Sequence, residues 1–123
     1  MKEKMYRICV YGSLRKGGSL NYMLGSEPLT TILVNNFLMY DLGAYPAIYQ
    51  SDDPKHQIVA EVYNVTEAVF NTITLMEKSA GYTTWHIPDL KAYIYVYKEK
   101  PKAKLIESGD WIEYQESGAW NND

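Results

Sequence analysis

The sequence predicts an α+β fold, rich in strands and with one main helix, from three observations. Short runs of β-branched and aromatic residues, separated by turn residues, recur through the chain. One segment, residues 66–80, instead has apolar residues at helical spacing. With 123 residues and 46% hydrophobic content, the chain can bury one core but not two, so we expect residues 1–123 to form a single domain.

Composition narrows the classes of partner and compartment. A net charge of −3 disfavours nucleic acid and anionic membrane as partners, and no apolar run approaches the roughly 20 residues that span a bilayer. The single cysteine excludes an internal disulfide and indicates a reducing, cytoplasmic compartment. We interpret Cys9 as a buried hydrophobe in a strand. The two histidines, His56 and His86, have no second ligand at metal-binding spacing, so no metal is expected.

The first third of the chain predicts short strands. Tyr6–Tyr11 alternates weakly and indicates a strand, and Gly17–Gly25 then forms a short helix or a loop. Leu29–Tyr40 is rich in β-branched and aromatic residues but is interrupted at Asn35–Asn36. That interruption predicts either two short strands or one bent strand with a bulge.

A turn and two more strands follow. Asp41–Pro46 has turn composition, and its Tyr45–Pro46 bond is a candidate cis peptide. Ala47–Tyr49 is a further short strand, and Gln57–Val65 alternates regularly. Glu61 lies on the second of these strands beside apolar neighbours, and we interpret its face of the strand as partly open to water.

Thr66–Ala80 is the main predicted helix. Thr66 is a suitable N-cap and Gly81 is placed to end the helix. The apolar stripe at helical spacing contains a carboxylate, Glu77; its apolar members are Val69, Phe70, Ile73, Met76 and Ala80. Glu77 therefore either lies at the edge of the stripe and reaches water, or faces a cavity with its pKa raised by desolvation.

The last third of the chain predicts a strand pair and polar loops. Tyr82–Ile87 and Leu90–Tyr97 are strands split by a turn at Pro88, and the tyrosines of the second strand are expected to pack against a wall of the fold. Lys98–Lys104 is a solvated basic loop, and Ser108–Trp111 is a turn with a large apolar anchor. The end of the chain, residues 118–123, is expected to be frayed.

The end of the first strand carries the clearest candidate site. Apolar chain stops at Gly12, and Arg15, Lys16 and two further glycines follow. Backbone N–H groups at such a turn can converge on an anion, although an ordinary strand-to-loop corner explains the same residues. Arg15 or Lys16 adds positive charge at the mouth of the site or belongs to a solvated loop. Ser13 has no base partner in the sequence and is not expected to be a nucleophile.

At this point the residues resemble a known family, the γ-glutamylcyclotransferase-like (AIG2-like) proteins. The resemblance lies in five stretches in the expected order: Tyr11-Gly12-Ser13-Leu14, Gly43 to Ala47, Ala60-Glu61-Val62-Tyr63, the helix with Glu77, and Ser108 to Trp111. It implies a mainly antiparallel β-barrel with one main helix, and release of 5-oxoproline from a γ-glutamyl amine or γ-glutamyl amino acid by a transferase- or lyase-type enzyme without a cofactor.

The resemblance also implies roles for single residues. Glu77 would be the general acid/base, and the substrate would contact Tyr11, Gly12, Ser13, Leu14, Tyr45 and Tyr82. Three positions depart from the family pattern: Thr74 replaces an aspartate, Lys78 replaces a glycine, and Thr84 stands where an arginine often follows.

Two other functions stay open on the sequence alone. The same cavity in a non-catalytic binding module would hold a small amino-acid-like ligand, which the altered helix motif favours. A nucleic-acid or protein interaction domain would use the tyrosine face and the Lys98–Lys104 loop, which the negative net charge disfavours. We expect a small-molecule partner and a monomer or weak homodimer.

Overall fold

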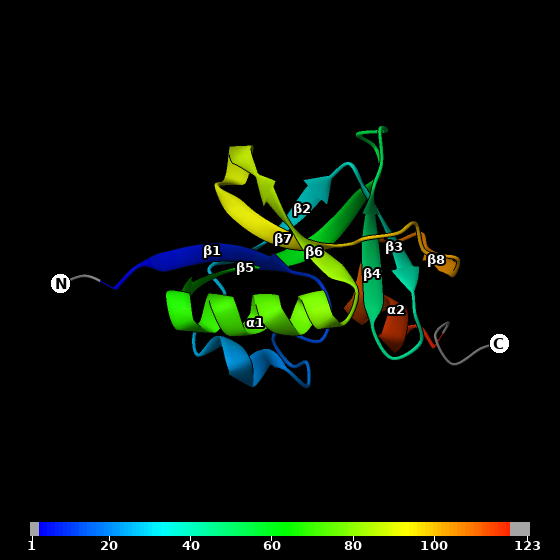
Figure 1. Ribbon diagram of the computed structural model, residues 1–123. Helices are drawn as coiled ribbons and strands as arrows, with labels where there is room; N and C mark the ends of the chain where they lie inside the picture. Colours follow the sequence, from blue (N-terminus) through cyan, green and yellow to red (C-terminus); the bar gives the residue numbers. More distant parts are fainter. Residues whose placement is uncertain (1–2, 119–123) are drawn as a thin grey trace.

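The computed structural model describes residues 3–118 and places the strands in two sheets (Figure 1). The strands are β1 Met5–Val10, β2 Thr30–Asn35, β3 Phe37–Asp41, β4 Pro46–Gln50, β5 Gln57–Thr66, β6 Tyr82–Ile87, β7 Ala92–Tyr97 and β8 Lys104–Ile106. The helices are α1 Glu67–Ser79 and α2 Trp111–Glu116, with short 3-10 turns η1 Asn21–Leu24 and η2 Pro88–Leu90.

β1 lies at the centre of the larger sheet. That sheet has the order β2-β5-β1-β7-β6, and the smaller one has the order β4-β3-β8. β1 pairs antiparallel with β5, where Cys9 lies opposite Val62, and parallel with β7, where Cys9 lies opposite Ile94. All other described pairings are antiparallel, so the mixed, mainly antiparallel α+β class is confirmed.

The prediction of a closed barrel is wrong. Within residues 3–118, β2 and β6 are the two free edges of the larger sheet, and no pairing joins them. The chain leaves β2 through Asn36, whose φ of 72° turns it directly into β3 and the separate smaller sheet. Closure needs every edge strand to find a partner, and here the remaining strands pair with one another instead.

The larger sheet is buried on both faces around β1. Alternate residues of β1 point to opposite sides: Ile8 and Val10 belong to the core beneath α1, while Cys9 belongs to the core against the smaller sheet. Burial on both faces explains why the alternation of this strand is weak in the sequence. The turn after β1 is thereby held between the two cores.

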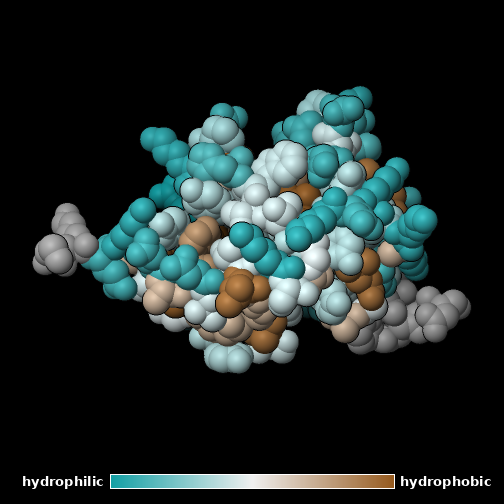
Figure 2. Space-filling model, in the orientation of Figure 1, coloured by the Kyte–Doolittle hydropathy of each residue, from teal (hydrophilic) through white to brown (hydrophobic). Residues whose placement is uncertain are grey.

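α1 packs along the larger sheet and forms as predicted. The Thr66 hydroxyl accepts from the Val69 amide at 3.2 Å, which confirms the N-cap, and Ile73 is fully buried. Gly81 follows the helix with φ of 100°, a value that favours glycine. Apolar side chains gather over the region of α1 and the segment beneath it in Figure 2, and Leu75 on the outer side of the helix is 73% exposed.

Several local predictions are settled by the structure. Leu29–Tyr40 forms two strands, and the described residues contain no cis peptide bond, so the Tyr45–Pro46 candidate is wrong. β8 begins where the predicted loop ends at Lys104, and α2 begins where the predicted turn ends at Trp111; neither element was predicted, because both are too short to show a period. The buried Trp111 confirms the predicted anchor. The frayed end was predicted for a segment that lies, beyond Gly118, outside the described residues.

No helix among the described residues is both long enough and apolar enough to cross a membrane.

Candidate active site

One cavity of about 220 Å³ lies between the end of β1, the turn before β4, and the last turns of α1. All seven residues predicted as site residues line it: Tyr11, Gly12, Ser13, Leu14, Tyr45, Glu77 and Tyr82. The structure thus brings together segments that are far apart in the chain. Pockets for drug-sized ligands are roughly 300–1,000 Å³, so this cavity suits a small molecule.

Glu77 brings a carboxylate into this cavity without a partner. It comes from the last turn of α1, and its side chain makes no hydrogen bond or ion pair with any residue from 3 to 118. Desolvation by burial raises its pKa from 4.5 to about 7. Of the two interpretations from the sequence, the one in which the carboxylate faces a cavity is confirmed.

Three tyrosines line the walls around Glu77 and are all held neutral. The Tyr11 hydroxyl donates to the Tyr95 carbonyl at 2.6 Å, and the Tyr82 hydroxyl donates to the Pro46 carbonyl at 2.7 Å. Burial raises the pKa of all three phenols above their usual range, to about 12 for Tyr95. These hydroxyls are engaged within the protein, so they fix the walls of the cavity and leave Glu77 as the lining group that titrates near neutral pH.

The turn after β1 presents unused backbone donors. The Gly12 carbonyl accepts from the Arg15 amide at 2.9 Å, the Ser13 carbonyl accepts from the Leu20 amide at 3.0 Å, and the Leu14 carbonyl accepts from Asn21 Nδ2 at 2.9 Å. The N–H groups of Ser13 and Leu14, in contrast, donate to no group within residues 3–118. Successive free N–H groups in a turn can bind an anion, which is one of the two interpretations that the sequence left open for this turn.

Gly12 is required by close packing. A Cβ atom on Gly12 would lie 2.9 Å from both Cγ and Cδ of Pro46, a separation that real Cβ contacts essentially never show. Pro46 follows Tyr45, so this contact closes the turn before β4 against the turn after β1. The absence of a side chain on Gly12 therefore lets these two cavity-lining turns pack together.

Two charged residues near this turn lie where the sequence did not place them. Arg15 is only 7% exposed and pairs with Glu61 at 2.9 Å and with Asp110 at 3.0 Å, so its assignment to a solvated loop is wrong. Glu61 is 5% exposed, so its strand face is not open to water as predicted. Lys16 does lie in a solvated position, paired with Glu27 at 3.1 Å.

The three departures from the family pattern affect the cavity unequally. Lys78 is exposed and Thr84 does not line the cavity, so neither reaches its interior. The Thr74 hydroxyl lies 2.7 Å from the Tyr95 hydroxyl and so supports a cavity wall. Tyr95 is a lining residue that sequence reasoning missed, because its tyrosine stripe was assigned to packing alone. Its position on a strand next to β1 becomes visible only with the sheet order.

The remaining metal-ligating and thiol side chains of the described residues are scattered or buried. Among residues 3–118 no three His, Cys, Asp or Glu side chains are grouped so as to hold a metal ion. Cys9 is fully buried, as predicted, and burial raises the pKa of its thiol to about 11.

Comparison with known proteins places these features in context. Residues 8–113 match the family model described as "Gamma-glutamyl cyclotransferase, AIG2-like". The chain is 33% identical over 109 residues to the "Gamma-glutamylcyclotransferase family protein YtfP" of Escherichia coli K12, covering 87% of this chain and 96% of that protein. It is 32% identical over 115 residues to PH0828 of Pyrococcus horikoshii, covering 91% of this chain and 96% of that protein.

The fold is likewise shared with solved structures. The crystal structure of PH0828 matches with a TM-score of 0.78 over 96% of this chain and 99% of that one, at 28% identity. The solution structure of ytfP from Escherichia coli matches with a TM-score of 0.66 over 89% of this chain and 98% of that one, at 32% identity.

Proposed function

We propose that this chain, which belongs to the gamma-glutamyl cyclotransferase, AIG2-like family, is a cyclotransferase that releases 5-oxoproline from a γ-glutamyl amine or γ-glutamyl amino acid. One observation carries the proposal: an unpaired carboxylate with a pKa near 7 shares a small cavity with a turn whose N–H groups are free. A base that titrates near neutral pH and an anion site are the two groups that this reaction requires.

In the proposed reaction the substrate's α-amine attacks its own γ-carbonyl carbon. The new C–N bond closes a five-membered lactam while the original amide C–N bond breaks, so no water or second substrate is consumed. Glu77 accepts the proton that the α-amine loses and delivers it to the departing nitrogen. Because attack is intramolecular, the remaining task of the protein is to hold the flexible glutamyl chain in a near-attack conformation.

The lining of the cavity suits an amino acid head group. Glu77 is its only charged residue among those described, so it attracts the substrate's α-ammonium group. No lysine or arginine side chain is available there for the α-carboxylate. The free N–H groups of Ser13 and Leu14 support binding of that carboxylate or of the oxyanion that forms on the γ-carbonyl oxygen.

The test is release of 5-oxoproline from a panel of γ-glutamyl amines and γ-glutamyl amino acids. Wild-type protein is expected to form product, and Glu77→Gln to lose about 10²–10⁴-fold in kcat, the usual contribution of general acid–base catalysis. Glu67→Gln, an exposed carboxyl at the other end of α1, is the matched control and should keep full turnover.

The same assay separates the enzyme from a binding module. γ-Glutamyl compounds would raise the melting temperature of a non-catalytic module, which would form no product. They would also raise the melting temperature of a cyclotransferase, which would release 5-oxoproline from them. Full turnover by Glu77→Gln would refute the role of the carboxylate.

A further inference from the structure

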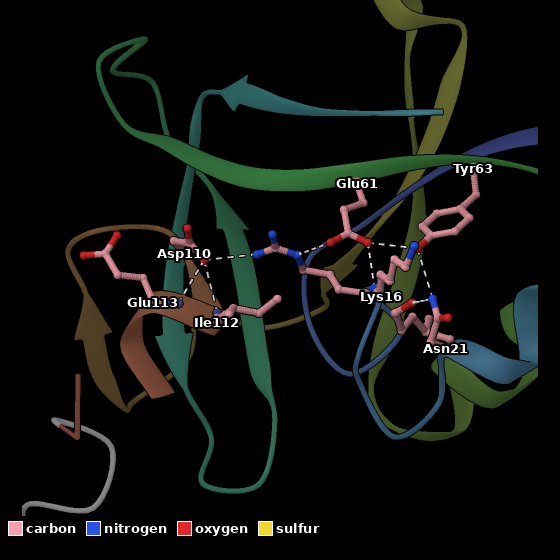
Figure 3. A network of polar contacts seen from close by, with 9 residues as sticks. Lys16, Asn21, Glu61, Tyr63, Asp110, Ile112 and Glu113 are labelled. Atoms are coloured by element: carbon pink, nitrogen blue, oxygen red, sulfur yellow. Dashed lines mark hydrogen bonds and ion pairs between the residues drawn. The ribbon is translucent and has the colours of Figure 1, made fainter. Parts of the chain in front are cut away.

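Behind the turn that lines the cavity lies a second buried carboxylate, Glu61 on β5. It is 5% exposed and accepts three hydrogen bonds: from Arg15 Nε at 2.9 Å, from the Lys16 amide at 2.7 Å, and from the Tyr63 hydroxyl at 2.8 Å. Figure 3 shows this network, with Glu61 on the strand and Lys16 on the loop that faces it. Two of its three donors therefore belong to the loop that continues the turn.

A second arm of the network reaches the turn itself. Asn21 Nδ2 donates to the Tyr63 hydroxyl at 3.0 Å and to the Leu14 carbonyl at 2.9 Å. Tyr63 lies between Glu61 and Asn21 (Figure 3) and hydrogen-bonds to both. Asn21 in turn fixes the peptide group of Leu14. Glu61 consequently contacts the segment directly at residues 15 and 16 and indirectly at residue 14.

A third arm ties the loop to α2. Arg15 Nη1 donates to Asp110 Oδ1 at 3.0 Å, and the same oxygen caps α2 by accepting from the amides of Ile112 at 3.1 Å and Glu113 at 3.2 Å. Strand β5, the loop and α2 are thereby joined through one guanidinium group. Arg15 holds this position at 7% exposure, out of reach of the cavity, so its charge serves the network rather than the substrate.

Backbone hydrogen bonds within the loop, such as those from the Gly18 amide to the Arg15 carbonyl at 2.8 Å and from the Leu20 amide to the Ser13 carbonyl at 3.0 Å, set part of its path. Gly17 has φ of 88°, and a Cβ on Gly18 would lie 2.2 Å from the Ser13 carbonyl oxygen, so both glycines are required by the backbone path. Glycine-rich backbone has many accessible conformations when it is not held. The network around Glu61 adds contacts from outside the loop to these internal bonds, and together they hold the conformation that leaves the Ser13 and Leu14 N–H groups free.

We propose that Glu61 is a positioning residue: through Arg15, the Lys16 amide and the Tyr63–Asn21 pair it holds the turn after β1 in the form whose free N–H groups bind the substrate's α-carboxylate. The inference rests on the proposed function. The α-carboxylate is assigned to these groups because the cavity offers no cationic side chain, the Tyr11 and Tyr82 hydroxyls donate within the protein, and the Tyr95 hydroxyl is paired with the Thr74 hydroxyl.

The experiment compares Glu61→Gln with wild type by steady-state release of 5-oxoproline and by calorimetric titration with 5-oxoproline itself, which carries the same carboxylate. Glutamine keeps the size of the side chain but not its charge. We expect KM and the dissociation constant of 5-oxoproline to rise about tenfold, the usual range for weakening a charge-assisted hydrogen bond. We expect kcat and its pH profile to be unchanged, because Glu77 has no contact with the network.

Two further variants complete the design. Tyr63→Phe removes only the hydroxyl that links Glu61 to Asn21, and it should raise KM about threefold. This variant tests the proposal even if Glu61→Gln does not fold. Glu27→Gln is the matched control, since it breaks the exposed pair of Glu27 with Lys16 on the same loop and should leave KM unchanged.

The outcomes separate this inference from the proposed function. A wild-type protein that forms no 5-oxoproline overturns the proposed function, and this inference with it. Wild-type turnover with an unchanged KM in both Glu61→Gln and Tyr63→Phe overturns the positioning role alone. A lowered melting temperature with KM unchanged would show that the network is merely structural.

Discussion

Glu61 and Glu77 are both drawn out of bulk solvent, yet the chain treats them in opposite ways. Glu61 has three hydrogen-bond donors and an arginine, all supplied by the protein. Glu77 has none among residues 3–118, and desolvation raises its pKa to about 7. A buried carboxylate whose two oxygens both accept hydrogen bonds from the protein stabilises a structure, whereas an unpaired one is available to a substrate. Glu61 is the more deeply buried of the two, since Glu77 is only partly buried, yet it is Glu61 that has partners and Glu77 that has none.

The largest expected loss of stability follows from removing the arginine that pairs with Glu61. Arg15→Met leaves Glu61 and Asp110 without their shared guanidinium, and removing one partner of a buried ion pair costs about 3–5 kcal/mol. We expect a loss of that size in the free energy of unfolding in urea. Lys16→Met, which breaks an exposed pair on the same loop, should cost less than about 1 kcal/mol. Equal losses in the two variants would contradict the comparison.

Replacing the unpaired carboxylate of Glu77 should have the opposite effect and raise the free energy of unfolding. Glu77 keeps its proton up to about pH 7 in the folded protein but loses it near 4.5 when unfolded, so the free energy of unfolding falls as pH rises between these values. Glu77→Gln has no such loss and should be more stable than wild type at pH 8, by about 2–3 kcal/mol, with the difference vanishing below pH 4.5.

The measurement is urea unfolding of both proteins at pH 4.5 and pH 8. Glu99→Gln, a change at an exposed loop carboxyl, serves as control and should follow the wild-type curve. Parallel pH dependence of wild type and Glu77→Gln would show that Glu77 is solvated.

The pH dependence of kcat/KM should also follow the ionisation of Glu77. Because the base must be ionised, kcat/KM is expected to fall about tenfold for each pH unit below about 7 and to level off above it, until the other groups titrate. In Glu61→Gln the fall in kcat/KM should begin at the same pH, since the network around Glu61 does not contact Glu77. A fall in kcat/KM that begins only near pH 4.5 would show that the base is solvated and would contradict the raised pKa of Glu77.

The smallest expected effect concerns the wall of the cavity. Thr74→Val removes the hydroxyl that lies 2.7 Å from the Tyr95 hydroxyl, and a single neutral hydrogen bond contributes about 1 kcal/mol. We expect a loss of that size in urea unfolding, with Glu77 still titrating near pH 7 in the turnover profile. A loss above about 3 kcal/mol would mean that Thr74 supports more than this tyrosine.

Much of the site was open to prediction because its parts are local patterns. The N-cap, the apolar stripe and the final glycine place Glu77 within or at the edge of the buried stripe of α1 without reference to any other element. A strand that ends in glycines likewise predicts free backbone donors from the sequence near Gly12 alone. Elements of three to six residues, such as β8 and α2, carry no such period and were missed.

What the tertiary structure alone decided are the partners across long sequence separations. Arg15 meets Glu61 across 46 residues and Asp110 across 95, and no local pattern distinguishes these carboxylates from solvated ones. Sheet closure was undecidable for the same reason, because edge pairing depends on where β2 and β6 come to lie. Periodicity determines which side of an element faces inward, but only packing determines what it meets there.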